Sequence, residues 1–219
     1  SKRVKGTIGF GSMNDPYMAI EKEQQLTRQA LQLVKRFRFP VHIITKSNLV
    51  VRDIDLLKEI AKVYAAVSIT ITTANDFLSK EIEPGAPVSS LRFEALKVLS
   101  DAGIYAGITL MPVLPFITDD FRNLEELIIK AKESGVKYIL ASTGMTLREG
   151  QREYFYDQLN RRFPGLKERY IQTYGNTYSC NVPHAHNLWH KLNALCQSLS
   201  IPVKMEYYKP IENQQLKLF

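Results

Sequence analysis

Five short apolar segments, each followed by a helical pattern, constrain the fold of this chain more than any other feature. They recur at intervals of about 25 to 35 residues. Strands that alternate with helices at such intervals are typical of parallel βαβ units, whose crossovers are right-handed. The sequence therefore predicts an α/β fold with strands at 6–11, 41–46, 66–72, 104–111 and 136–142.

The segments between these strands predict helices at 23–38, from Asp53 to about Tyr64, from Ser89 to Gly103 and from Asp119 to Gly135. We expect Asp53 to cap its helix, and a glycine just past the last turn, such as Gly103, to end one. The segment from Asn75 to Pro87 predicts a loop with at most a short helix. The apolar face expected to point inward from 23–38 consists of Leu26, Ala30, Leu33, Val34 and Phe37.

The strand–helix alternation stops near Arg148. Helical patterns follow at 149–163, 165–174 and 183–199, and a terminal strand is predicted at 201–205. We expect a first unit over 1–147 and a helical C-terminal extension over 148–219 that packs on it, within a single domain.

Composition places limits on the class of protein. The chain has 219 residues, 45% of them hydrophobic, and no run of roughly 18 apolar residues that would predict a membrane span. Ser1 to Lys5 lack the apolar segment of a signal peptide, and the missing start methionine indicates a fragment. Two cysteines are too few for a disulfide framework, which favours a cytoplasmic protein. The net charge of +7 favours phosphate-bearing partners, although solvated helix faces explain it equally well.

Polar residues stand at or near the ends of the first three predicted strands. Asp15 follows the first strand, Lys46 ends the second, and Ser68 lies within the third. Because the carboxyl ends of parallel strands converge to build ligand sites, the sequence predicts one polar site that contains these three side chains.

Several sequence blocks, in a fixed order over about 100 residues, carry a resemblance to a known family. The blocks are Asn14-Asp15-Pro16-Tyr17 with Ile20-Glu21, Thr45-Lys46-Ser47, Val67-Ser68-Ile69, Glu83-Pro84 with Ala86-Pro87, and Arg92 followed by Ala102-Gly103-Ile104. Through them, residues 6 to about 146 resemble the radical S-adenosylmethionine superfamily, in the branch of spore photoproduct lyases and DNA repair photolyase-like proteins.

The resemblance implies a partial (β/α)6 TIM-like barrel whose strand ends surround S-adenosylmethionine and a 4Fe-4S cluster. It implies that Asn14 and Asp15 face the amino acid moiety and ribose of the cofactor, that Lys46 pairs with its carboxylate, and that Ser68 bonds the ribose. Arg92 lies in the first turn of a helix, where a cation is unfavourable, so we expect an anionic partner: either Glu83 or the cofactor's carboxylate.

The implied function is that of an enzyme which, with an external electron donor, generates a 5′-deoxyadenosyl radical for hydrogen abstraction. The cofactor supplies that chemistry, and the protein binds and orients it. A nucleic acid is a candidate substrate. The oligomeric state is left open.

Two departures from the family pattern limit this interpretation. No CxxxCxxC motif is present to hold the cluster, so we expect the cluster segment to lie outside this chain and the chain alone to be inactive. Met13 occupies the position of the hydrogen-donor cysteine of spore photoproduct lyases, and a thioether has no S–H to give. The sequence therefore favours a relative with a different substrate.

Other interpretations of the same residues stay open. Lys46 could be a surface lysine or the Schiff-base lysine of a barrel lyase, and Asp15 could simply cap a turn. Ser68 could satisfy a neighbouring backbone group. The whole chain could also be a non-catalytic nucleic-acid or nucleotide-binding module.

Two further clusters have a functional and a structural interpretation. Cys180, His184, His186 and His190 have a spacing close to that of a zinc site, although they also fit an ordinary packed helix. The aromatic and basic run from Tyr154 to Arg162 could stack on nucleic acid or pack on the barrel, and packing is favoured.

Overall fold

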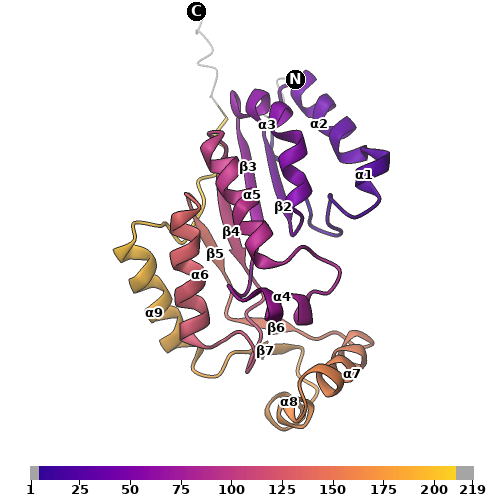
Figure 1. The fold of residues 1–219 in the computed structure, drawn as a ribbon, viewed down its shortest axis with the longest axis vertical. Helices are drawn as coiled ribbons and strands as arrows, with labels where there is room; N and C mark the ends of the chain where they lie inside the picture. Colours follow the sequence, from indigo (N-terminus) through magenta and orange to yellow (C-terminus); the bar gives the residue numbers. More distant parts are fainter. Residues whose placement is uncertain (1–4, 211–219) are drawn as a thin grey trace, which may run out of the picture.

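The computed structural model describes residues 5–210, so the sequence predictions that concern residues 1–4 and 211–219 lie outside the described residues. Within 5–210, five strands form one parallel sheet in chain order, β1-β2-β3-β4-β5 (Figure 1). The strands are β1 (Ile8–Phe10), β2 (Val41–Thr45), β3 (Ala65–Thr70), β4 (Tyr105–Leu110) and β5 (Ile139–Ala141). The predicted α/β partial barrel is confirmed, and each observed strand falls within or beside its predicted range.

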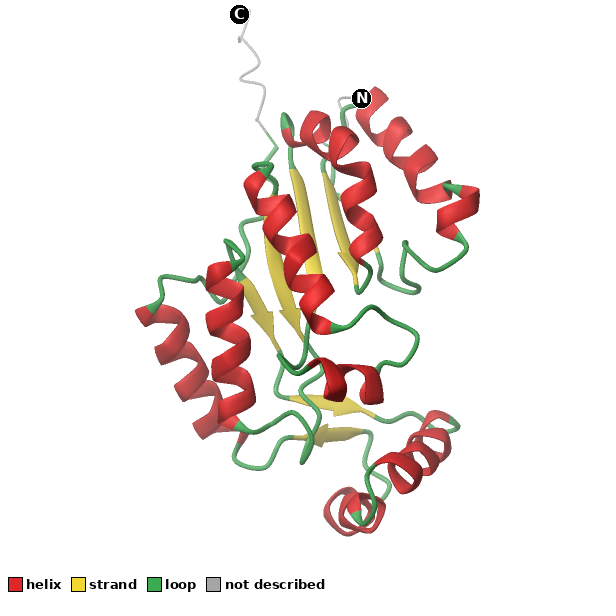
Figure 2. Ribbon diagram, viewed as in Figure 1, coloured by secondary structure: helices red, strands yellow, loops and turns green. Residues whose placement is uncertain are grey.

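Three helices cover one face of the sheet: α3 (Ile54–Ala61), α5 (Ser89–Asp101) and α6 (Phe121–Glu133) (Figure 2). Successive strand residues point to opposite faces. In β3, Val67 and Ile69 therefore pack into the main core with Leu57 of α3 and Leu96 of α5. Ala66 belongs to a second cluster on the other face, with Tyr138 and Met205.

The helix predicted at 23–38 is divided into α1 (Glu21–Gln24) and α2 (Leu26–Arg36), because Gln25 adopts a left-handed conformation with φ of 51°. The predicted inward face is confirmed for Val34 and wrong for Leu26, Leu33 and Phe37. Leu26, Leu33 and Phe37 are more than half exposed, whereas Leu31 and Val34 are buried. The buried residues of α2 are Thr27, Leu31 and Val34, and α2 packs against α3.

Between β2 and α5 lie a 3-10 helix, η1 (Asn48–Asp53), and a short helix, α4 (Asp76–Ile82). Asp53 stands at the predicted N-cap position of α3, but its side chain accepts no capping hydrogen bond. Its carboxylate is bonded by Arg28, Arg52 and Tyr17 instead. Charge-assisted bonds to two guanidinium groups are stronger than a single bond to a backbone N–H.

The C-terminal part contains α7 (Gln151–Arg162), α8 (Leu166–Tyr174) and α9 (Ala185–Ser198), all three as predicted. It also contains a two-stranded antiparallel ribbon, β6 (Gly144–Thr146) and β7 (Ser179–Asn181), which the sequence did not predict. Because β6 precedes residue 148 and β7 follows it, the ribbon ties the predicted extension to the first unit. The boundary at 147 stays a prediction.

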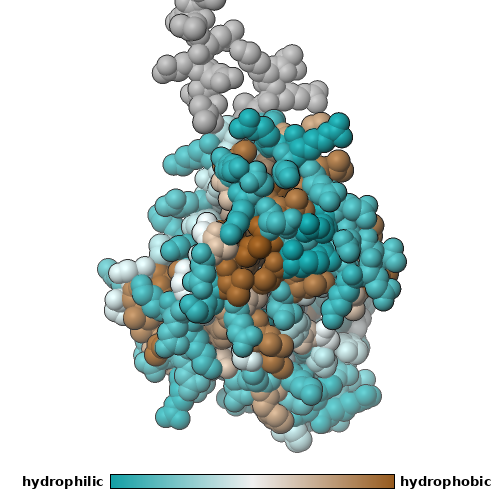
Figure 3. Space-filling view, turned by 45° about the horizontal axis from the view of Figure 1, so that its top comes forward, coloured by the Kyte–Doolittle hydropathy of each residue, from teal (hydrophilic) through white to brown (hydrophobic). Residues whose placement is uncertain are grey.

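The terminal strand predicted at 201–205 is wrong, since that segment has no strand structure. It still runs beside the sheet, because the carbonyl of Pro202 accepts a hydrogen bond from the N–H of Ile139. Proline lacks the N–H that a second ladder bond needs. Among residues 5–210, no helix is both long and apolar enough to cross a membrane. Figure 3 shows a largely hydrophilic surface with an apolar area near its centre.

Candidate functional site

A cleft of about 450 Å³ lies at the carboxyl ends of β1 and β2. Three segments line it: the chain from Asp15 to Lys22, the turn from Lys46 to Leu49, and the loop from Gly85 to Pro87. Two of the predicted site residues, Asp15 and Lys46, are therefore brought together in one cavity. This is the position in which parallel α/β sheets bind ligands.

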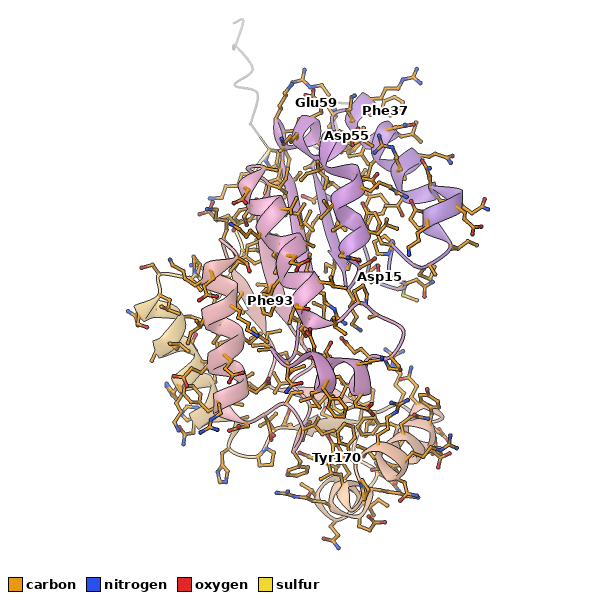
Figure 4. The ribbon with its side chains drawn as sticks, viewed as in Figure 1. Asp15, Phe37, Asp55, Glu59, Phe93 and Tyr170 are labelled. Atoms are coloured by element: carbon orange, nitrogen blue, oxygen red, sulfur yellow. The ribbon has the colours of Figure 1, made fainter. Side chains whose placement is uncertain are left out.

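Asp15 joins the end of β1 to the end of β2 (Figure 4). One of its oxygens accepts hydrogen bonds from the backbone N–H of Tyr17 (2.9 Å) and the hydroxyl of Thr45 (2.6 Å), and the other accepts from the backbone N–H of Lys46 (2.7 Å). Gly11 makes this approach possible, because it has φ of 99° and a Cβ there would collide with the carbonyl of Ile44. A carboxylate has about four acceptor positions, so Asp15 retains about one.

Lys46 heads a chain of three charged side chains. Its Nζ lies 3.1 Å from one oxygen of Glu83, and the other oxygen of Glu83 lies 2.6 Å from Nη1 of Arg92. The expected pairing of Arg92 with Glu83 is thereby confirmed. Lys46 is 42% exposed, whereas Arg92 is 1% exposed. Since two cations share one carboxylate, these three side chains together carry a net positive charge beside the cleft.

Arg92 connects the end of β3 to the loop that lines the cleft. Its guanidinium donates to the carbonyls of Thr70 (2.8 Å) and Pro87 (2.7 Å), which links the end of β3 to the loop that lines the cleft. Nη2 of Arg92 and the hydroxyl of Thr109 are buried and have no hydrogen-bond partner among residues 5–210. Thr109 pairs with Thr70 across β3 and β4, so both unpartnered groups lie near one pair of strand ends.

A second network holds the loop that follows Asp15. The hydroxyl of Tyr17 donates to the fully buried Asp53 (3.1 Å), which also accepts from Arg28 (2.8 Å) and Arg52 (2.9 Å). Burial and the neighbouring Asp53 carboxylate raise the pKa of the Tyr17 hydroxyl well above its usual range. Arg52 also bonds Glu21 at the start of α1 (2.7 Å). One wall of the cleft is therefore fixed to η1 and α3.

The other predicted residues lie away from this lining. Ser68 is fully buried, and its hydroxyl lies 2.8 Å from Nε2 of His42 and 2.7 Å from the hydroxyl of Tyr138. A ribose contact by Ser68 stays a prediction, and it needs one of these partners to move. Asn14 is exposed outside the cleft lining, and Met13 is 91% exposed.

The described residues fit parts of S-adenosylmethionine. Lys46 offers an ammonium for a carboxylate, and Asp15 retains an acceptor position for a hydroxyl. They do not fit an iron–sulfur cluster. Residues 5–210 contain no group of three or more His, Cys, Asp or Glu side chains able to hold a metal ion.

The cysteines and histidines of the C-terminal part do not form the zinc site considered above. Cys180 and Cys196 are buried free thiols, and burial raises the pKa of both, that of Cys196 to about 11. A raised pKa disfavours the thiolate that a metal requires. His186 and His190 contact each other on the exposed side of α9.

The aromatic run of α7 mainly packs. The ring of Phe155 meets that of Tyr170 at a centroid distance of 5.2 Å, and Arg162 pairs with Glu81 at 3.0 Å. Tyr170 is fully buried (Figure 4), whereas Tyr154 remains 67% exposed. Phe155 thus packs on α8 within the C-terminal part, Arg162 ties α7 to α4, and Tyr154 stays exposed.

Comparison with curated proteins finds relatives that are described as uncharacterized. The chain is 31% identical over 179 residues to an uncharacterized protein of Methanocaldococcus jannaschii, which covers 81% of this chain and 60% of the relative. It is 28% identical over 169 residues to an uncharacterized protein of Mycobacterium tuberculosis, which covers 77% of this chain and 49% of the relative. The chain thus spans about half the length of the curated relatives that it matches. No family model matches it.

Among solved structures, the chain superposes on a mutant of spore photoproduct lyase with bound S-adenosylmethionine and dinucleoside spore photoproduct, with a TM-score of 0.68. The match covers 94% of this chain and 63% of the lyase at 12% sequence identity. The chain has the fold of a radical S-adenosylmethionine enzyme. At this identity the likeness concerns the fold, and the resemblance given by the sequence blocks is confirmed at that level.

Sequence reasoning missed Tyr17 and Lys22 as lining residues of the cleft. Both follow Asp15 in the same loop and first helix, but no spacing rule marks a residue as facing a cleft. It also missed the pairing of His42 with Ser68. A histidine within the apolar strand Val41–Thr45, beside a strand with a buried serine, was the available signal.

Proposed function

We propose that this chain forms the S-adenosylmethionine-binding part of a radical S-adenosylmethionine enzyme related to spore photoproduct lyases. The observation that carries the proposal is the cleft at the ends of β1 and β2, lined by Asp15 and Lys46, in a fold shared with a lyase solved with that cofactor. When bound beside a reduced cluster, S-adenosylmethionine supplies a radical that abstracts hydrogen. The cluster would be held by residues other than those described.

The residues of this chain bind and orient the cofactor. An ammonium has three donors, and since Glu83 engages one donor of Lys46, two remain for the cofactor's carboxylate. Asp15 would accept from a ribose hydroxyl with its remaining position. Arg92 acts through Glu83 and the loop carbonyls as a positioning residue. The proposal also assigns a ribose contact to Ser68 and a cofactor contact to Asn14.

Binding of S-adenosylmethionine to the tag-free chain, measured by equilibrium dialysis, tests the proposal. A charge-assisted contact contributes about 1.5 to 3 kcal/mol, so Lys46→Met should weaken binding by about 10- to 100-fold. Lys62→Met is the matched control, because Lys62 is an exposed lysine paired with Glu59 and lies outside the cleft lining. Saturable binding that is equal in both variants, or no binding by the unaltered chain, would contradict the proposal.

Catalysis is tested separately. With reductant and cofactor, the 219-residue chain should release no 5′-deoxyadenosine, because its described residues hold no cluster site. Robust release would mean that the analysis of the cluster ligands is wrong.

The substrate class belongs to the same proposal. A related structure of spore photoproduct lyase is complexed with dinucleoside spore photoproduct. The net charge of +7 and the exposed Tyr154 also suit a nucleic acid. A non-catalytic nucleic-acid module is the second candidate. Salt-dependent binding of oligonucleotides without any binding of S-adenosylmethionine would favour it, and binding of both would favour the enzyme.

A further inference from the structure

Two exposed histidines form a close pair on α9, outside the cleft. Nε2 of His186 lies 2.9 Å from Nε2 of His190, with the rings nearly perpendicular at 84°. The residues are four apart in the helix, so their side chains project from one face. Leu188, Leu192 and Cys196 form the buried face, and α9 packs against α6 on the outer side of the sheet (Figure 1).

We propose that His186 and His190 form a two-histidine chelate for a divalent transition metal, with water in the remaining positions. Imidazole nitrogens bind such metals at about 2.0 to 2.1 Å. A separation of 2.9 Å then corresponds to an N–metal–N angle of about 90°. Neighbouring positions of a square-planar or octahedral ion meet at that angle, which favours Cu²⁺ or Ni²⁺ over tetrahedral Zn²⁺.

The surroundings leave the pair open to a metal ion. Both rings belong to the first two turns of α9. Both side chains are exposed, so an ion and its waters can reach them. The first turn of α9 contains no acidic residue, so no carboxylate there competes for the rings.

Titration of the tag-free chain with CuCl₂ and with NiCl₂ by calorimetry tests this site. We expect one ion per chain. His186→Gln and His190→Gln should each weaken binding by more than about tenfold, because each removes a direct ligand. His184→Gln is the matched control, since His184 is an exposed histidine just before the same helix and lies outside the pair.

A second measurement separates chelation from a structural effect of the variants. The circular dichroism spectra of the three variants should match that of the unaltered chain, so that a loss of binding reports the missing ligand and not a change in fold. Equal affinities in His184→Gln, His186→Gln and His190→Gln, or no saturable binding by the unaltered chain, would overturn the proposal. Because the pair lies outside the cleft, the result is independent of S-adenosylmethionine binding.

Discussion

At the scale of single residues, the inner face of the sheet holds a buried polar relay. Ser68 joins His42 of β2 to Tyr138 beside β5, and burial lowers the pKa of His42 below its usual value. A buried hydroxyl bonded on both sides stabilises the fold, because a partner left alone would be buried and unsatisfied. The relay explains why a serine can lie within a fully buried strand.

Protonation of His42 should therefore destabilise the protein. Its pKa is lower in the folded state than in the unfolded chain, so the unfolded state binds more protons below about pH 6.5. The contribution of neutral His42 to the free energy of unfolding should be fully present above that pH. It should be lost as the pH drops below it. Urea denaturation at several pH values measures the slope. His42→Gln should flatten it, and an unchanged slope would contradict the assignment.

A second residue-scale feature is the contact between Gly107 and Tyr138. A Cβ at Gly107 would lie 2.5 Å from the ring of Tyr138, so Gly107→Ala should lower the free energy of unfolding by about 1 to 3 kcal/mol. Gly9→Ala is the control, because a Cβ at that strand glycine meets nothing within 4 Å, and no loss is expected. If urea denaturation shows the same loss of unfolding free energy for both variants, the Tyr138 ring moves aside at little cost and the prediction is wrong.

At the scale of elements, the cleft depends on how α1, η1 and α3 are tied together. Asp53 is the common acceptor for Tyr17, Arg28 and Arg52, and it replaces the helix cap that the sequence predicts. The same network holds α2 against α3, which leaves Leu26, Leu33 and Phe37 exposed. The ion pairs of Arg28 with Asp53 and Asp55 thus tie α2 to η1 and α3.

Asp53→Asn should lower the free energy of unfolding by about 2 to 3 kcal/mol, because it removes the buried negative charge that Arg28 and Arg52 share. Asp55→Asn is a matched control: Asp55 also pairs with Arg28 but is 57% exposed, so the loss should stay below about 1 kcal/mol. Urea denaturation of both variants provides the comparison. A larger loss for Asp55→Asn would contradict this account of the network.

At the scale of the whole molecule, a ligand in the cleft would contact three segments that are far apart in the sequence. S-adenosylmethionine at about 100 times its Kd should stabilise the chain by about 2.7 kcal/mol and raise Tm by about 5 to 10 °C. Differential scanning fluorimetry measures the shift. Lys46→Met should show a much smaller one at the same concentration, and an equal shift would mean that the ligand binds elsewhere.

The sequence by itself determined the order of elements, the parallel sheet and the grouping of Asp15 with Lys46. These depend on local periodicity and on the rule that parallel strands end at one edge, and both are readable along the chain. The motif blocks also pointed to the fold that the solved lyase shares with this chain.

Only the tertiary structure decided the rest. The buried face of α2, the role of Asp53, the enclosure of Ser68 by His42 and Tyr138, and the β6–β7 ribbon all depend on contacts between residues distant in sequence. Burial and ion pairing outweigh the small local preferences of a capping residue or an apolar stripe, and those preferences are what a sequence displays.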